Sequence, residues 1–385
     1  MSIVIVGAGL AGATAATELR KQGHTGEIVL IGAESHAPYE RPPLSKDYLL
    51  GKQPFEKALV HPEPWYAEHD IDLRLGTRAT AVDLERRVVH TEPAAGEGAP
   101  TEVPYEQLLL ATGATPRQLD LGAGPMLTLR TADDSTRLRE AIGPGTRVVI
   151  VGAGWIGLEV AAAARQAGAD VTVFETAELP LLRVLGAEIA TVIAELHRGH
   201  GVDLRLGTQV TADDLDEADL RIAAVGVSPA VELAEAAGLE MGNGVLVDAT
   251  LRTSDPHVWA IGDIADHAHP TLGRRIRVEH WDTAIEQGKV VARNLLGADE
   301  PYERLPYFFT DQYDMGMEYV GSVGPDGYDR VDIEGPTDVL AGDAFRAFWV
   351  RDDRVVAAMH INDWDASDAI RDSIGTVRAG VGTAT

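Results

Sequence analysis

The stretch SIVIVGAGLAGATAATELRKQG, residues 2–23, decides the fold. It opens with a short, continuous β-branched run at residues 3–6, which is typical of a strand covered on both faces in a parallel sheet. An Ala-rich segment with helical composition follows, and Gly23 closes it. A second β-rich run, residues 27–34, ends in Glu34. The order strand, helix, strand predicts a βαβ motif.

The same motif occurs a second time in the chain. RVVIVGAGWIGLEVAAAARQAG, residues 147–168, repeats the strand and helix pattern, and DVTVFE, residues 170–175, supplies the second strand and ends in Glu175. A length of 385 residues is enough for two or three domains at roughly 150 residues each. The repeat therefore predicts two domains of one architecture.

Each copy carries the spacing Gly-x-Gly-x-x-Gly between its strand and its helix. The glycines are Gly7, Gly9 and Gly12 in the first copy and Gly152, Gly154 and Gly157 in the second. In this pattern the first glycine allows a tight turn, the second lets a pyrophosphate approach the backbone, and the third seats the helix on the strand. One copy alone would also fit a simple packing turn. Two copies, each with a Glu at the end of its second strand, favour two dinucleotide sites, a flavin held permanently and a nicotinamide that exchanges.

A third segment, HVWAIGD at residues 257–263, has the form of a buried strand. It ends at Gly262 and Asp263, where a carboxylate can bind ribityl hydroxyls. The alternative is a simple strand-end turn. Because the segment follows the second motif in the chain, we expect the first domain to be discontinuous. The predicted division is a flavin domain at 1–112 and 238–318, a nicotinamide domain at 113–237, and an α+β domain at 319–385.

Composition excludes several classes of protein. The 60 acidic and 33 basic residues give a net charge of −27, which predicts no nucleic acid and no membrane partner. No basic, cleavable leader is recognisable at the N-terminus, so a cytoplasmic location is expected. The chain has no cysteine, which excludes disulfide scaffolds, thiolate metal sites and mechanisms that need a Cys pair.

Several longer motifs are specific in combination. They are PYERPPLSK at 38–46, LLLATGATPR at 108–117, GAGWIGLEVAA at 152–162, LRTSDPHVWAIGD at 251–263, EHWDTAIEQG at 279–288 and PYFFTDQYD at 306–314. From about residue 2 to 321 the chain resembles the FAD-dependent ferredoxin reductases of bacterial oxygenase and cytochrome P450 systems. The resemblance implies an α/β fold with two Rossmann-like, glutathione-reductase-like domains and a small α+β C-terminal domain. It also implies electron transfer from NADH through FAD to a [2Fe-2S] ferredoxin that supplies a P450 or Rieske-type oxygenase.

The resemblance also implies site residues. FAD would be bound by Gly7, Gly9, Leu10, Ala11, Gly12, Glu34, Arg41, Lys46, Ala79, Thr112, Gly113, Arg130, Gly262 and Asp263, with Glu279, His280 and Trp281 near the isoalloxazine. NADH would be bound by Gly152, Gly154, Trp155, Ile156, Gly157, Glu159, Glu175 and Gly226. Lys46 and Glu159 would be the catalytic residues, as an ion pair beside the flavin N5 and the nicotinamide. We expect Glu159 on the first turn of the helix that follows the second glycine loop. The alternatives are compensation of the helix dipole for Glu159 and a solvated loop cation for Lys46.

The expected chemistry follows from electron counting. A nicotinamide delivers two electrons as hydride, an iron-sulfur protein accepts one at a time, and a flavin can do both. Disulfide reductases share the two-nucleotide architecture but need a Cys pair that this chain lacks. The alternatives within this chemistry are an NADH oxidase, a single-component flavin hydroxylase and a redox-sensing flavoprotein that binds NADH.

Coenzyme choice and partner docking are predicted from charge. A carboxylate at Glu175 accepts hydrogen bonds from a ribose 2′-hydroxyl and repels a 2′-phosphate, which predicts a preference for NADH over NADPH. The cluster Arg274, Arg275 and Arg277 is local positive charge that would suit an acidic ferredoxin, although a solvated strand face is the alternative. We expect a monomer or a weak homodimer.

Other positions are predicted to be without a site or depart from the family. Asp266, His267 and His269 could imitate a metal site, but surface histidines and no metal are expected. The family usually carries Trp where this chain has Phe309. Residues 208–219 leave no room for an extra hairpin that the family commonly has, so the nicotinamide lobe is trimmed.

Overall fold

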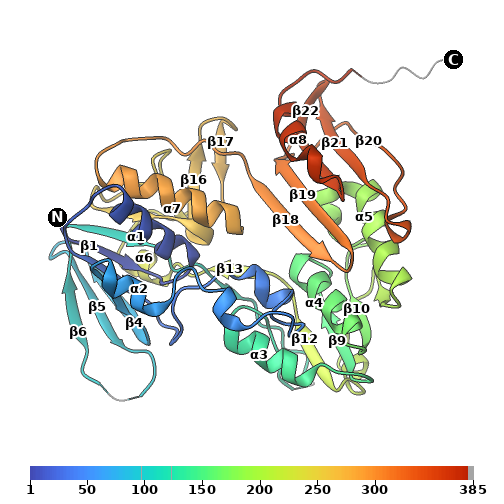
Figure 1. Cartoon of the computed structure of the whole chain (residues 1–385), viewed down its shortest axis with the longest axis horizontal. Coiled ribbons are helices and arrows are strands. Elements are labelled where there is room, and N and C mark those ends of the chain that lie inside the picture. Colours follow the sequence, from blue (N-terminus) through green and yellow to red (C-terminus); the bar gives the residue numbers. More distant parts are fainter. Residues whose placement is uncertain (97, 123, 380–385) are drawn as a thin grey trace. The chain divides into compact units, whose positions relative to one another are not determined.

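The computed structural model describes residues 1–96, 98–122 and 124–379 (Figure 1). The chain forms two compact units. Unit 1 comprises residues 1–41, 54–115 and 227–304, and unit 2 comprises residues 42–53, 116–226 and 305–385. Each unit is assembled from three separate stretches of the sequence.

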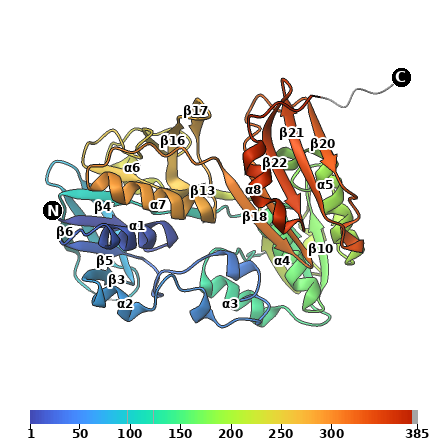
Figure 2. The ribbon, with the colours of Figure 1, turned by 45° about the horizontal axis from the view of Figure 1, so that its top comes forward.

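Unit 1 is built on a parallel five-stranded sheet. Its strands, in spatial order, are β15 (Val258–Ala260), β7 (Gln107–Leu110), β1 (Ile3–Val6), β2 (Ile28–Ile31) and β3 (Ile71–Arg74). Every residue of β1 and β2 is buried, which explains why both strands are continuously apolar. The helices α1 (Leu10–Lys21) and α7 (Trp281–Leu295) pack side by side (Figure 2).

The carboxyl ends of the four strands from β2 to β15 lie in register. Val6 at the end of β1 is opposite Ile31 of β2 and Leu110 of β7, and Leu110 is opposite Ala260 of β15. In parallel α/β sheets, ligands bind beyond these carboxyl ends, where the strand order reverses. In unit 1 the reversal is at β1, between β2 and β7.

Smaller elements complete unit 1. They are the antiparallel sheet β4 (Thr77–Asp83), β5 (Val88–Pro93) and β6 (Thr101–Pro104), the sheet β14 (Val245–Val247), β16 (Ala265–His269) and β17 (Arg274–Ile276), and the helices α2 (Glu63–Glu68) and α6 (Glu232–Ala236). Strands β8 (Ala114–Pro116) and β13 (Val227–Pro229) pair with each other where the chain passes between the units.

Unit 2 repeats the parallel architecture. Its sheet has the order β11 (Asp203–Arg205), β10 (Asp170–Phe174), β9 (Arg147–Val151) and β12 (Leu220–Ala223), with the helices α3 (Ala132–Ala141), α4 (Trp155–Gln166) and α5 (Leu182–Gly199). The same strand, helix, strand order occurs in both units, so the two predicted βαβ motifs are confirmed. Only a short 3-10 turn at Asp213–Leu215 lies between β11 and β12 in this described stretch.

The C-terminal part of unit 2 is the expected α+β structure. An antiparallel sheet has the order β18 (Tyr307–Gln312), β19 (Met315–Gly321), β22 (Arg354–Ile361), β21 (Phe345–Arg351) and β20 (Arg330–Glu334), with helix α8 (Ser367–Ser373). The sheet begins at Tyr307, and the predicted boundary at residue 319 lies inside β19. One hydrophobic core joins this sheet to the parallel sheet of unit 2.

One prediction about this fold is wrong. The histidines of β16 were expected at the surface, yet His267 and His269 are each 1% exposed and Asp266 is buried. The reason is that both rings lie on one face of β16, where they pack against the buried ring of Tyr302 at centroid distances of 5.2 and 6.5 Å. Within the described residues, no cluster of three or more ligating side chains is placed to hold a metal ion, and no helix is long and apolar enough to cross a membrane.

Candidate functional site

The first glycine loop follows β1 and opens α1. Gly7 has a φ of 118°, and a Cβ on it would lie 2.1 Å from the carbonyl oxygen of Ala111. A Cβ on Gly12 would lie 2.1 Å from the carbonyl oxygen of Gly7. A Cβ on Gly9, the N-cap of α1, would meet nothing within 4 Å. The first and third glycines are therefore required by packing, whereas the second faces open space at a helix N-terminus, which fits a pyrophosphate.

The second glycine loop, in unit 2, has the same construction. Gly152 has a φ of 105°, and a Cβ there would lie 2.4 Å from the carbonyl oxygen of Ala224. A Cβ on Gly157 would lie 2.1 Å from the carbonyl oxygen of Gly152, and one on Gly154 would meet nothing within 4 Å. This loop therefore also fits a dinucleotide pyrophosphate. Ile156, on the first turn of α4, is 45% exposed although it is apolar.

Glu34 and Glu175, which follow the second strand of each βαβ motif, have different hydrogen-bond partners. Glu34 forms an ion pair of 3.2 Å with Arg41 and accepts a hydrogen bond from the Tyr39 hydroxyl. Glu175 accepts a hydrogen bond of 2.8 Å from the amide of Ala153, inside the glycine loop, and one of 2.9 Å from the amide of Ala177. Glu175 thus holds the second glycine loop in place through a side-chain hydrogen bond.

Strand ends in unit 1 are held by two hydrogen bonds. The Thr112 hydroxyl donates to the carbonyl of Ala230 at 2.6 Å, and the amide of Gly262 donates to the Gln287 side chain at 2.7 Å. Gln287 is 1% exposed and was missed at the sequence level. Its position inside the EHWDTAIEQG motif was the only available signal.

The residues expected near the isoalloxazine gather at the N-terminus of α7. His280 is the N-cap of this helix. The indole of Trp281 donates to Glu40 at 3.1 Å, and Glu279 forms an ion pair with Arg277.

The remaining predicted residues are distributed over both units. Leu10 and Ala11 begin α1, Ala79 lies at a bulge in β4, Gly113 and Gly226 adopt φ values of 75° and 94°, Asp263 lies in a 3-10 turn after β15, Arg130 precedes α3, and Trp155 begins α4. Arg130 and Lys46 belong to unit 2, whereas the other residues predicted to bind FAD belong to unit 1.

Lys46 and Glu159 form an ion pair within unit 2. The distance from Lys46 Nζ to Glu159 Oε1 is 2.7 Å, and the side chains are 16% and 5% exposed. Two hydroxyls also donate hydrogen bonds to the Glu159 carboxylate. Ser45 donates to Oε2 at 2.5 Å and Thr310 donates to Oε1 at 2.6 Å. A buried ion pair needs such additional hydrogen bonds to offset its desolvation. Neither Ser45 nor Thr310 was predicted.

The placement of Glu159 on α4 requires a correction. The first turn of α4 contains no acidic residue, because the helix starts at Trp155 and Glu159 begins the second turn. At that depth the side chain lies beyond the exposed amides of the helix start, so compensation of the helix dipole does not explain it. Its partners are instead Lys46, Ser45 and Thr310.

Aromatic rings line the same region of unit 2. The ammonium of Lys46 lies 5.4 Å from the ring centroid of Phe309. The ring of the neighbouring Phe308 contacts the ring of Trp155, with the two centroids 4.9 Å apart. It also stacks on the ring of Tyr319, with the centroids 4.4 Å apart. The position where the family usually carries Trp is therefore beside Lys46 in this chain.

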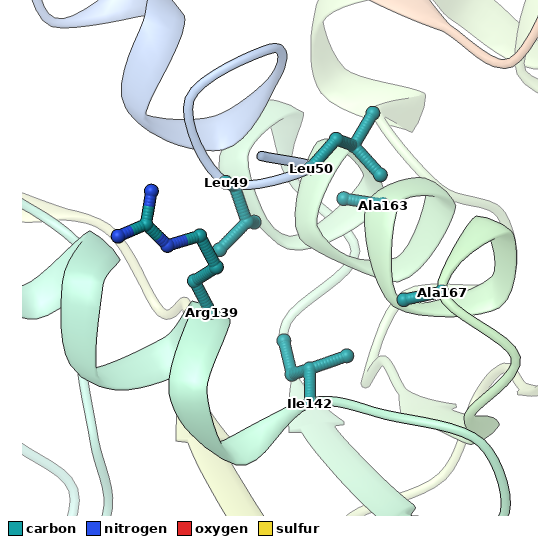
Figure 3. Close-up of a pocket in the computed structure, with 6 residues that line it drawn as sticks. All are labelled: Leu49, Leu50, Arg139, Ile142, Ala163 and Ala167. Carbon is teal, nitrogen blue, oxygen red and sulfur yellow. The ribbon is translucent and has the colours of Figure 1, made fainter. Parts of the chain in front are cut away.

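A small pocket lies next to the segment that carries Lys46. It has a volume of about 120 Å³ and is lined by Leu49, Leu50, Arg139, Ile142, Ala163 and Ala167 (Figure 3). Arg139 also lies over the Tyr48 ring at 4.7 Å. The Ser135 hydroxyl donates to the carbonyl of Leu44 at 2.7 Å, so α3 holds this segment in place.

Comparison with known proteins identifies the class. Residues 1–288 match the pyridine nucleotide-disulphide oxidoreductase family, and residues 307–379 match the reductase C-terminal family. The chain belongs to the pyridine nucleotide-disulphide oxidoreductases with a reductase C-terminal domain. Within that class its similarity is to the ferredoxin reductases of oxygenase and P450 systems, so it is a flavin-dependent ferredoxin–NAD(+) reductase.

The individual similarities extend over nearly the whole chain. It is 40% identical to the ferredoxin–NAD(+) reductase component of the anthranilate 1,2-dioxygenase system of Burkholderia cepacia, over 93% of this chain and 90% of that protein. It is 36% identical to putidaredoxin reductase of Pseudomonas putida, over 94% and 88%. The reductase in the covalent putidaredoxin reductase–putidaredoxin complex superposes with a TM-score of 0.89 at 35% identity, covering 98% of this chain and 94% of that one. The family brings FAD and a nicotinamide dinucleotide as cofactors.

Proposed function

We propose that this chain takes electrons from NADH in preference to NADPH and delivers them to a [2Fe-2S] ferredoxin that serves a P450 or Rieske-type oxygenase. The observation that carries the proposal is the pair of glycine loops, each with an open second glycine, in a chain without cysteine. Bound FAD would supply the conversion of a hydride into two single electrons.

The coenzyme preference is supported by Glu175. Its carboxylate is fixed by the amides of Ala153 and Ala177, at the carboxyl end of β10 where an adenosine ribose would arrive. A fixed carboxylate there accepts from a 2′-hydroxyl and repels a 2′-phosphate.

Lys46 and Glu159 are proposed as the pair beside the reacting rings. A partly buried ammonium held by a carboxylate places fixed positive charge where negative charge develops during hydride transfer. The contacts with Ser45 and Thr310 hold that carboxylate in one orientation. We assign the FAD-binding roles to the residues that the sequence predicts for them.

Ferredoxin docking is proposed at Arg274 and Arg275. Arg275 is exposed, and its guanidinium donates to the carbonyls of Val247 and Asp266 at 2.9 and 2.8 Å, which fixes the group without neutralising it. Arg277 contributes less, because its side chain is 10% exposed and paired with Glu279.

The proposal is tested by anaerobic titration of the purified protein with NADH, followed by addition of an oxidised [2Fe-2S] ferredoxin. We expect a yellow protein whose flavin absorbance is bleached by NADH and restored by ferredoxin. A protein that cannot be loaded with FAD would overturn the proposal. Rapid reoxidation by air without a response to ferredoxin would identify an NADH oxidase, and slow turnover with every acceptor together with a change of oligomeric state on NADH addition would identify a sensor. A monomer or weak homodimer is proposed for the working reductase.

A further inference from the structure

The buried side of β18 carries two polar side chains, Thr310, which contacts Glu159, and Gln312, which has no role assigned so far. Thr310 and Gln312 alternate along the strand and therefore point to the same face, where they are 0% and 1% exposed. Buried polar groups must be hydrogen-bonded to offset their desolvation. Their partners connect them to Glu159.

An uninterrupted row of hydrogen bonds runs from Glu159 into the core of unit 2. The Thr310 hydroxyl donates to Glu159 Oε1 at 2.6 Å, and the Gln312 amide nitrogen donates to the Thr310 oxygen at 3.1 Å. Gln312 Oε1 is 2.7 Å from Nε2 of His197, which is fully buried on α5. The Tyr313 hydroxyl lies 3.5 Å from His197 Nδ1.

The donor and acceptor atoms of each side chain fix the direction in which the hydrogen bonds of this row run. Because Gln312 presents its oxygen to His197, the ring must donate from Nε2, and Nδ1 is left as an acceptor facing Tyr313. Burial lowers the pKa of His197 to about 4, so the ring is neutral near pH 7. Every donor in the row therefore points toward the carboxylate of Glu159. Successive hydrogen bonds of one direction polarise and strengthen one another.

We propose that Thr310, Gln312 and His197 are positioning residues that lock the orientation of the Glu159 carboxylate and, through it, the ammonium of Lys46. This inference rests on the proposed function, in which that ion pair lies beside the reacting rings. The row acts by orientation, because a glutamine amide is a poor carrier of protons. Removing the Thr310 hydroxyl would free one carboxylate oxygen to turn and would let the ammonium move with it.

The test compares two substitutions at Thr310. Thr310→Val keeps the shape of the side chain and removes the hydroxyl, whereas Thr310→Ser keeps the hydroxyl. In anaerobic stopped-flow mixing with NADH, we expect Thr310→Val to reduce its flavin roughly 5- to 30-fold more slowly, with Thr310→Ser close to the wild type. The FAD content and the midpoint of thermal unfolding are measured alongside. A wild-type rate in Thr310→Val, or an equal loss in both variants, would overturn the proposal.

Combining substitutions separates this inference from the proposed function. In a Lys46→Met background, Thr310→Val should cause no further slowing, because its effect passes through the ion pair. Fully additive losses would overturn the positioning role alone. A Lys46→Met protein that reduces its flavin at the wild-type rate would instead overturn the role of the ion pair in the proposed function.

A second readout needs no turnover. Long-range ¹H–¹⁵N NMR of the histidine rings reports which nitrogen carries the proton, and a His197→Asn variant assigns the signals. We expect a neutral ring protonated at Nε2 in the wild type at pH 7. A ring protonated at Nδ1, or at both nitrogens, would overturn the inferred direction of the row.

Discussion

Replacing Glu175 tests how this chain chooses its coenzyme. Glu175 makes two structural hydrogen bonds, to the amides of Ala153 and Ala177, so its charge and its bracing of the loop can be separated. Glu175→Gln keeps an oxygen that can accept from Ala153 and removes the charge. Glu175→Ala removes both. The matched pair therefore distinguishes repulsion of a 2′-phosphate from loss of loop geometry.

The expected magnitudes follow from the two kinds of interaction. Like charges in close contact cost on the order of 1 to 3 kcal/mol, which is roughly a 5- to 150-fold preference for NADH in kcat/KM. Glu175→Gln should lose most of that preference and keep most of its activity with NADH. Glu175→Ala should lose the preference and also about 10-fold or more in kcat/KM for NADH, because a hydrogen bond to a charged group contributes about 1.5–3 kcal/mol.

The assay is steady-state ferricyanide reduction with each coenzyme, for the wild type and both variants. Ferricyanide bypasses ferredoxin docking, so the ratio of kcat/KM values reports the coenzyme site alone. A wild type that uses both coenzymes equally, or a Glu175→Gln protein that keeps the full preference, would remove Glu175 from the specificity site.

Three further predictions concern charge elsewhere in the molecule. Lys46→Ala should slow flavin reduction by NADH by at least about 10-fold, a larger effect than its weakening of FAD binding, and an unchanged stopped-flow rate would refute this. Replacing Arg274 and Arg275 with Glu should raise the KM for ferredoxin without changing ferricyanide reduction, with a smaller effect at high salt, and an unaltered KM would leave both arginines as surface residues. Burial lowers the pKa of His197 and of His267 from 6.5 to about 4, so the unfolded chain binds more protons between these values and stability is lost as the pH falls through that window. The expected loss is up to about 1.4 kcal/mol per residue and pH unit, and a urea midpoint that is constant from pH 7 to pH 5 would contradict it.

The strands and glycine loops could be predicted because their requirements are local. A strand paired on both sides and covered on both faces must be apolar throughout, as residues 3–6 are. Gly12 is required by a contact within its own loop, because a Cβ on it would lie 2.1 Å from the carbonyl oxygen of Gly7. Constraints of this kind require particular residue types at particular positions, which can be recognised in the sequence.

The partners of Glu159 could not be predicted in this way. Thr310 and Gln312 reach Glu159 and His197 across more than a hundred residues of sequence, and nothing local distinguishes them from polar side chains on an exposed strand face. His267 was misplaced for the same reason, since the ring that covers it belongs to Tyr302, 35 residues further along the chain. The low exposure of Arg277 likewise depends on two contacts. Its guanidinium donates to the carbonyl of Asp263 and forms an ion pair with Glu279.

The central claim is tested most directly by following where the electrons from NADH go. The purified, FAD-loaded protein is given NADH and a [2Fe-2S] ferredoxin with cytochrome c as the terminal acceptor, and oxygen consumption without ferredoxin is measured in parallel. A ferredoxin reductase should reduce cytochrome c at a rate that depends on the ferredoxin concentration and far exceeds its oxygen consumption. Oxygen consumption that equals or exceeds the ferredoxin-dependent rate would contradict it.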